Sequence, residues 1–222
     1  MLYIIGVGPG DPELLTLKGH RILGNCDIIA GWSSVIRRFS KLIAGKEIVE
    51  ISYLTEARDL EYIADLARSR CVAFLIHGDP SVSDWQLMEK LRKLCRSYGI
   101  ECEIIPGVSS LNTALSREGL DMAEIIFISL HAEGAERYYE EIIKATSIGR
   151  EIVVFPEPYR DGPQRVARYL VSKGLKGTVK IYENLTYKDE HVYEYKLEDL
   201  AKEEREFSDL CVMILKLQID PK

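Results

Sequence analysis

The hydrophobic and polar positions in the first half of the chain alternate between short apolar runs and amphipathic segments. The apolar runs have the length of β-strands and lie at residues 2–5, 27–30, 47–51, 71–76 and 101–105. Segments with helical spacing separate them, at residues 12–23, 35–39, 60–67 and 86–98. The run 71–76 shows no polar alternation, which is typical of a strand buried on both faces. This order predicts a parallel sheet covered by helices on both faces.

After about Leu120 the pattern changes, because strand-like runs follow one another more closely. Strands are predicted at residues 124–130, 151–155, 178–182, 190–195 and 210–216, and helices at residues 136–145 and 166–172. Close spacing and the turn residues Lys188-Asp189 favour a mixed sheet with antiparallel edges. We therefore expect two α/β domains, residues 1–112 on a mainly parallel sheet and residues 113–222 on a mixed sheet.

Composition narrows the classes of function. The 222 residues are 46% hydrophobic and 29% charged, as in an ordinary globular protein. The formal net charge of −6 argues against nucleic-acid binding, which needs a positive surface. No apolar run approaches the roughly 20 residues that cross a bilayer. The apolar start Met1–Ile5 runs directly into a glycine turn, unlike a signal peptide. We therefore expect a cytoplasmic protein that binds neither nucleic acid nor membrane.

The cysteines do not follow the spacing of a disulfide framework or of a zinc site. They number five, no two are spaced as Cys-x-x-Cys, and they lie at positions 26, 71, 95, 102 and 211. Cys71 and Cys211 fall inside apolar runs. We interpret these cysteines as small buried hydrophobic residues, and we expect no metal site.

Three motifs lie where predicted strands end, and ligands bind beyond the carboxyl ends of strands in open α/β sheets. They are Gly6–Asp11, His77–Ser81 and Ile105–Ser110. The first has Asp11 where a dinucleotide fingerprint requires glycine, and no Gly-Lys-Ser/Thr follows as in a P-loop. Its glycines still permit close approach of the backbone to a flat or bulky ligand. Each polar residue taken alone could equally cap a helix, so the convergence of three motifs carries the functional interpretation.

These motifs, in this order and at this spacing, resemble those of the tetrapyrrole methylase family over nearly the whole chain. The matching segments are Gly6–Thr16, Gly78-Asp79-Pro80 and Ile105–Ser110. The resemblance implies a homodimeric S-adenosylmethionine-dependent enzyme with two α/β domains and an active site in the cleft between them. The chain departs from the family at His77, where a small residue is usual, and at Ser81–Ser83, where glycine and an aromatic residue are common.

Within the family, the second half is similar to the cobalt-precorrin-7 (C5)-methyltransferase branch, which also forms the N-terminal half of a precorrin-6Y C5,15-methyltransferase. The similar segments are residues 127–131, 182–190 and 207–210. At 222 residues there is no room for the second, decarboxylating half. We therefore expect a stand-alone C5 enzyme that acts on a small-molecule corrin precursor.

The resemblance also implies a set of site residues. Contacts to S-adenosylmethionine are expected from Gly8, Pro9, Gly78, Asp79, Val82, Ser109, Ser110, Leu130, Phe155 and Pro156. The substrate carries many carboxylates, and its contacts are expected from Gly10, Asp11, Arg37 and Arg38. Lys18, Arg21, Lys41 and Arg58 could extend this cationic rim, or the basic residues could simply form solvated helix faces.

Methyl transfer from a sulfonium to a nucleophilic carbon requires mainly positioning and the exclusion of water. Methylation at C5 also leaves a proton to remove. His131 is the first candidate for the base, because an imidazole titrates near neutral pH, and Asp79 is the second. A structural hydrogen bond in a turn is the other interpretation of His131.

Three other functions fit parts of the pattern. One is a diphthine synthase-like protein methyltransferase, against which the complete Gly-Pro-Gly-Asp turn and Ser129-Leu130-His131 argue. The second is a ribose methyltransferase acting on ribosomal RNA, which the acidic balance disfavours. The third is a non-catalytic tetrapyrrole-binding module, which would bind the substrate without turnover.

Overall fold

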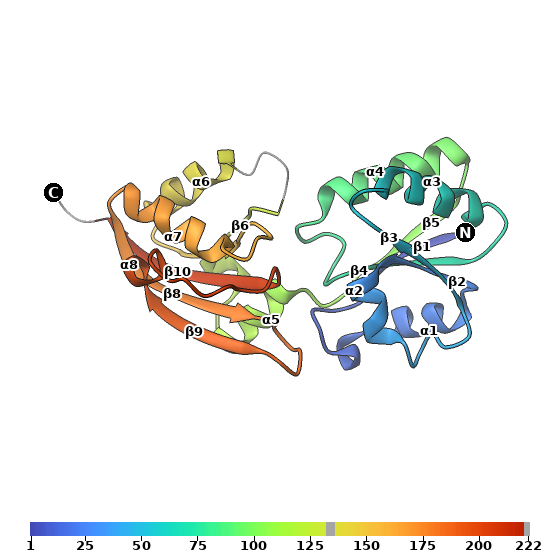
Figure 1. The fold of residues 1–222 in the computed structure, drawn as a ribbon, viewed down its shortest axis with the longest axis horizontal. Helices are drawn as coiled ribbons and strands as arrows, with labels where there is room; N and C mark the ends of the chain where they lie inside the picture. The colour runs from blue at the N-terminus through green and yellow to red at the C-terminus, as the bar shows by residue number, and fades with distance from the viewer. Residues whose placement is uncertain (132–135, 220–222) are drawn as a thin grey trace. The chain divides into compact units, whose positions relative to one another are not determined.

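The computed structural model describes residues 1–131 and 136–219 and divides into two compact units, Met1–Ser109 and Ser110–Lys222. Each unit contains one five-stranded sheet, and each is considered by itself (Figure 1). The second domain expected from the sequence, 113–222, includes residues 132–135 and 220–222, which lie outside the described residues. The prediction of two α/β sheets, one parallel and one mixed, is confirmed.

The first unit is a parallel sheet in the order β3-β2-β4-β1-β5. Its strands are β1 (Leu2–Gly6), β2 (Ile28–Trp32), β3 (Glu47–Ile51), β4 (Val72–Ile76) and β5 (Cys102–Ile105). Every residue of the central strand β4 is buried, as its unbroken apolar sequence requires. The carboxyl ends of all five strands therefore lie at one edge of this sheet.

Helices cover both faces of the parallel sheet (Figure 1). On one face lie α3 (Glu56–Ala67) and α4 (Trp85–Tyr98), and on the other lie α1 (Leu17–Asn25), α2 (Ser33–Ile36) and the 3-10 turn η2 (Arg37–Phe39). Alternate strand residues pack into two separate cores. Phe74 joins the core under α3 and α4, and its neighbour Leu75 joins the core on the other face.

The single helix predicted over residues 12–23 is wrong. The segment forms a 3-10 turn η1 (Pro12–Leu14) and then, after a break, the helix α1. Asp11 caps the first by accepting the Glu13 N–H at 2.9 Å. Thr16 caps the second by accepting the Gly19 N–H at 3.1 Å. Two caps five residues apart start two short helical segments where the apolar spacing indicated one.

The second unit is a mixed sheet in the order β6-β7-β10-β8-β9, in which only the β6–β7 pair is parallel. Its strands are β6 (Ile125–Ser129), β7 (Glu151–Phe155), β8 (Leu175–Glu183), β9 (His191–Lys196) and β10 (Cys211–Ile219). Its helices are α5 (Ser110–Glu118), η3 (Met122–Glu124), α6 (Glu136–Thr146), α7 (Gly162–Ser172) and α8 (Leu197–Leu200). The short α8 was not predicted.

The two faces of the mixed sheet are covered differently. Val179 and Ile181 point into the core formed with α6, α7 and α8. Lys180 and Tyr182 alternate with them and point to the opposite face, where both bind the carboxylate of Glu118 at the end of α5. Among the described residues, no helix of either unit combines the length and the apolar character needed to span a membrane.

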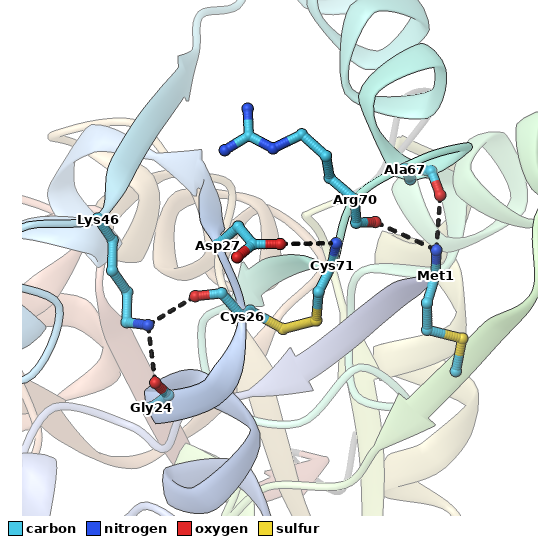
Figure 2. Close-up of a disulfide and its surroundings, with 8 residues drawn as sticks. All are labelled: Met1, Gly24, Cys26, Asp27, Lys46, Ala67, Arg70 and Cys71. Atoms are coloured by element: carbon cyan, nitrogen blue, oxygen red, sulfur yellow. Dashed lines mark hydrogen bonds between the residues drawn. A yellow bond between two sulfur atoms is a disulfide. The ribbon is translucent and has the colours of Figure 1, made fainter.

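Cys26 and Cys71 form a disulfide, so the interpretation of the cysteines as separate buried residues is wrong for this pair (Figure 2). Cys26 directly follows α1 as its C-cap, and Cys71 directly precedes β4. The strands that follow them, β2 and β4, are neighbours paired from Ile28 and Val72 onward. The pairing is therefore made by the sheet, and chain spacing could not reveal it.

Further hydrogen bonds tie the same amino-terminal edge together (Figure 2). The N-terminal amine of Met1 donates to the Ala67 carbonyl at 2.6 Å. Lys46 Nζ donates to the carbonyls of Gly24 and Cys26 at 2.8 and 2.6 Å. This edge lies opposite the carboxyl ends of the strands, so we expect the disulfide to stabilise the fold without taking part in ligand binding.

Reduction of the disulfide is expected to destabilise the first unit. The bond spans 45 residues of sequence. A loop of that size gains about 4 kcal/mol of chain entropy in the unfolded state when it is opened. Urea unfolding with and without a reductant measures the difference. A Cys26→Ser/Cys71→Ser variant is the control, since its unfolding should not respond to the reductant. Identical curves for the native chain under both conditions would contradict the assignment.

Candidate functional site

The ends of β1, β4 and β5 meet backbone to backbone. A Cβ atom built on Gly6 would lie 2.7 Å from the nitrogen of Gly107 and 2.7 Å from the carbonyl oxygen of Gly78. One built on Gly107 would lie 2.6 Å from the carbonyl of Gly6 and closer still to that of Gly78. Because Cβ atoms essentially never approach other atoms within 3.0 Å, no side chain fits at Gly6 or Gly107. The three motifs therefore converge, and we call Gly6, Gly78 and Gly107 the glycine contact.

Two backbone hydrogen bonds join the first motif to the second. The Gly8 N–H donates to the Gly78 carbonyl at 3.2 Å, and the Gly78 N–H donates to the Gly8 carbonyl at 2.9 Å. Gly8 and Gly78 have φ angles of 87° and 69°. This left-handed region is strained for residues with a Cβ atom, so glycine is needed at both positions.

Asp79 joins the second motif to the third. Its Oδ1 accepts the N–H of Ser81 at 2.7 Å, and its Oδ2 accepts the N–H of Gly107 at 2.8 Å. The Val82 N–H also donates to the Asp79 carbonyl at 3.0 Å. Both carboxylate oxygens thus hold backbone groups, and these contacts give Asp79 a positioning role.

His77 joins the second motif to the first through its side chain. Its Nε2 donates to the Pro9 carbonyl at 2.7 Å. The bond fixes the turn that contains Pro9 and Gly10, both of which are buried. His77 therefore supports the turn that is expected to contact the ligand. Asp11 caps η1, which is the structural role that the sequence also allowed.

The third motif continues into the second unit's first helix. Ser109 is buried, with 2% of its surface exposed, and Ser110 is the first residue of α5. Val82, three residues after Asp79, is half-buried. The structure thus places Gly8, Pro9, Gly78 and Asp79 around the glycine contact, with Ser109 and Ser110 following directly from Gly107. Their roles toward a ligand stay predictions.

In the second unit, Leu130, His131, Phe155 and Pro156 gather at one edge of the mixed sheet. Ser129 pairs with Phe155 at the ends of β6 and β7, and the Leu130 N–H extends that ladder to the Phe155 carbonyl at 2.8 Å. Leu130 and Phe155 are buried, at 1% and 6% exposure. The side chain of Leu130 belongs to the core of the unit, so a ligand could reach mainly its backbone.

The imidazole of His131 lies beside the Phe155 ring, with 5.7 Å between ring centres. Burial lowers the pKa of His131, while the charge of Asp209 and a hydrogen bond to the Pro156 backbone oppose that shift. Nε2 is buried and has no hydrogen-bond partner among the described residues, so the nitrogen that donates to the Pro156 carbonyl is Nδ1. A neutral ring in this tautomer carries its free lone pair on Nε2.

Asp209 also lines a cavity of about 570 Å³ that the sequence did not indicate as a site. Its lining comes from the loops that follow β7 and precede β10, at Pro158, Arg160, Glu206, Phe207, Ser208 and Asp209. The first loop is anchored, because the Tyr139 hydroxyl donates to Glu157 Oε2 at 2.6 Å. The segment 207–210 was noted only for its family resemblance, and no motif in it indicates a cavity.

The two predicted substrate-binding arginines differ in exposure. Arg37 is exposed on η2. The guanidinium nitrogens of Arg38 are buried, and its Cζ lies 5.8 Å from the centre of the Phe39 ring. Of the two, Arg37 is the one open to solvent. Within the described part of the chain, no three His, Cys, Asp or Glu side chains gather as ligands for a metal ion.

Comparisons with known proteins agree on one family. The model of the Tetrapyrrole (Corrin/Porphyrin) Methylases matches residues 1–201. A probable cobalt-precorrin-7 C(5)-methyltransferase of Methanocaldococcus jannaschii is 27% identical over 96% of this chain and 97% of its own length. The cobalt-precorrin-4 C(11)-methyltransferase of the same organism is 39% identical, over 50% of this chain and 43% of its own.

A solved structure of similar fold is that of the cobalamin biosynthesis precorrin-6Y methylase CbiE from Archaeoglobus fulgidus. It matches with a TM-score of 0.72 and covers 99% of both chains, at 20% identity. At that identity the likeness shows the fold alone.

Replacement of Asp79 by asparagine is expected to weaken the junction of the second and third motifs. An amide accepts hydrogen bonds only through its oxygen, so its NH₂ group would face the N–H of Ser81 or Gly107. Leaving a backbone donor without an acceptor costs about 2 kcal/mol. Urea unfolding of Asp79→Asn measures the loss. Asp11→Asn is the matched control, because asparagine caps helices as well as aspartate. Equal stability of the two variants would contradict the anchoring role.

Proposed function

The chain belongs to the tetrapyrrole (corrin/porphyrin) methylases and is a methyltransferase, and on that premise we propose that it methylates C5 of a corrin precursor of the cobalt-precorrin-7 or precorrin-6Y type. The match to a relative named for that position extends over 97% of the relative's length. The match to a relative named for C11 has higher identity but spans only 43% of that protein. The match to the C5 relative covers 96% of this chain, the second unit included, and this supports the C5 assignment.

The proposed methyl donor is S-adenosylmethionine, and the residues around the glycine contact fit such a ligand. Gly6, Gly8 and Gly78 are buried and let the three loops pack backbone to backbone, which fixes the rim on which the ligand is proposed to lie. The backbone N–H groups at the start of α5, with the Ser109 and Ser110 hydroxyls, are suited to a carboxylate or a ribose. When bound, the donor supplies an electrophilic methyl group. His77 and Asp79 hold the surrounding loops in place.

We assign the removal of the proton to His131. The single observation that carries this assignment is the buried Nε2, which has no partner among the described residues while Nδ1 is held by Pro156. In the balanced step, the corrin carbon forms a bond to the methyl carbon and the carbon–sulfur bond breaks, leaving a thioether. The proton lost from the corrin passes to Nε2 of His131. The lowered pKa keeps the ring neutral, and able to accept that proton, at neutral pH.

We propose that Gly10, Asp11 and Arg37 bind the substrate. Arg38, whose guanidinium nitrogens are buried, holds η2 in place beside Arg37. The family resemblance extends the proposal to a homodimer, which sedimentation of the purified chain would test. A protein methyltransferase of the diphthine synthase type and a non-catalytic tetrapyrrole-binding module are the competing functions.

Incubation of the chain with S-adenosylmethionine and cobalt-precorrin-7 is expected to raise the mass of the corrin by one CH₂ group. Mass spectrometry of the product follows the reaction. A protein methyltransferase of the diphthine synthase type modifies a translation elongation factor, so a parallel incubation with such a factor tests the first competing function. Corrin binding with no gain of mass would favour the binding module, and labelling of the elongation factor alone would favour the protein methyltransferase.

Substitution of His131 is expected to lower the turnover number with little change in the KM for S-adenosylmethionine. Loss of a general base costs about 10²-fold or more. Because the base is active when neutral and burial lowers its pKa, the rate of the native enzyme should fall as pH drops through a value below the ordinary histidine range. His131→Gln should lose that acidic limb. His191→Gln, at an exposed histidine, is the control. A variant that keeps both its rate and its acidic limb would exclude His131 as the base.

A further inference from the structure

Two free cysteines of the first unit lie against each other. Cys95 belongs to the last turn of α4 and is buried, with 5% of its surface exposed. Cys102 is the first residue of β5 and is partly exposed. Both side chains pack in the core under α3 and α4, and the Cys95 thiol donates a hydrogen bond to the Cys102 sulfur. We call Cys95 and Cys102 the thiol pair.

The way in which α4 ends explains why two cysteines seven positions apart meet. The helix stops at Gly99, whose φ of 63° is left-handed. The Ile100 N–H donates to the Cys95 carbonyl at 2.9 Å, as in a Schellman C-cap. The chain thereby reverses, and β5 starts two residues later with Cys102 on the face of the sheet that α4 covers.

The contact makes the two sulfurs chemically different. The hydrogen bond from Cys95, together with the charge of Arg92 on α4, lowers the pKa of Cys102 to about 7, although burial opposes the shift. The same bond raises the pKa of Cys95, and burial adds to the effect. Near neutral pH, Cys102 is therefore the thiolate and Cys95 the protonated partner. A thiolate is the nucleophile of thiol–disulfide exchange, and a second thiol in contact with it can resolve the product.

We propose that Cys95 and Cys102 are a site of reversible oxidation, at which a low-molecular-weight disulfide converts the thiol pair into a cross-link between α4 and β5. The Cys102 thiolate attacks one sulfur of the small disulfide, whose S–S bond breaks and releases one thiolate. Cys95 then loses its proton to water, and its sulfur displaces the second small thiolate from Cys102. Two cysteine thiols are oxidised, and one small disulfide is reduced to two thiols.

The third free cysteine lacks these features. Cys211 lies in the second unit with 3% of its surface exposed, and its Sγ donates to the Ser208 carbonyl at 3.2 Å. Burial raises the pKa of Cys211, which keeps the thiol protonated and unreactive. Cys26 and Cys71 are already joined. Oxidation by a small disulfide is therefore expected to be confined to the thiol pair.

The cross-link would lie within the segment that connects the second motif to the third. The helix α4 begins at Trp85, after the second motif, and β5 ends at Ile105, where the third motif starts. The thiol pair lies at the start of β5, the end of the strand away from the third motif. Oxidation should therefore restrain this segment without occupying the candidate site, and the inference does not depend on the proposed methyl transfer.

Incubation of the folded native chain with oxidised glutathione, followed by alkylation with N-ethylmaleimide, tests the thiol pair. Before alkylation, the intact mass should fall by two hydrogen atoms, with no glutathione attached. Trypsin cleaves after Arg96 and so separates Cys95 from Cys102, and mass spectrometry of the digest should find their two peptides joined by a disulfide. A reductant should restore both thiols. Alkylation of both cysteines after the incubation, or glutathione retained on Cys102, would overturn the inference.

Three variants assign the roles within the thiol pair. Cys95→Ser removes the resolving thiol, so glutathione should stay on Cys102 as a mixed disulfide. Cys102→Ser changes a partly exposed position, which keeps the test valid if the core substitution does not fold, and it should leave the buried Cys95 unmodified. Cys211→Ser, at another free and buried cysteine, is the matched control and should form the cross-link as the native chain does. Modification of Cys95 in Cys102→Ser at the native rate would contradict the assignment of Cys102 as the attacking thiolate.

Discussion

The ends of three parallel strands approach so closely that no side chain can lie between Gly6, Gly78 and Gly107. This contact converts three separate stretches of sequence into one continuous rim. Hydrogen bonds then fix its parts, with Gly8 and Gly78 paired through their backbones, Asp79 accepting from Gly107, and His77 donating to Pro9. The residues of the first unit expected to contact S-adenosylmethionine lie in these three loops or directly after them.

The proposed chemistry needs little more than that rim and one base. Methyl transfer to an electron-rich carbon depends on holding two reactants near attack distance. The backbone packing of the three loops fixes the positions of the residues proposed to hold the donor. The remaining requirement is an acceptor for one proton. His131 supplies a buried nitrogen whose lone pair is directed by the bond that Pro156 makes to the other ring nitrogen.

Sequence patterns were sufficient where local physics decides the structure. The strands β3 and β7 begin and end at the residues predicted from their apolar runs, and β4 is buried throughout as its composition indicated. Apolar patterns failed where a tertiary contact or a polar cap decides the structure. The Cys26–Cys71 bond exists because β2 and β4 are neighbours, and the break between η1 and α1 depends on two caps that apolar spacing does not record.

The candidate site also combines features that local sequence predicts with features that only the folded chain reveals. The glycine motifs were evident from spacing alone, whereas the anchoring bonds of His77 and Asp79 and the cavity beside Asp209 arise from residues distant in sequence. The most direct test of the central claim is the position of the transferred methyl group. Carbon NMR of the corrin product made with ¹³C-methyl-labelled S-adenosylmethionine should show a single enriched methyl group bonded to C5. Enrichment at C11 or at any other ring carbon, or in a protein acceptor, would contradict the account.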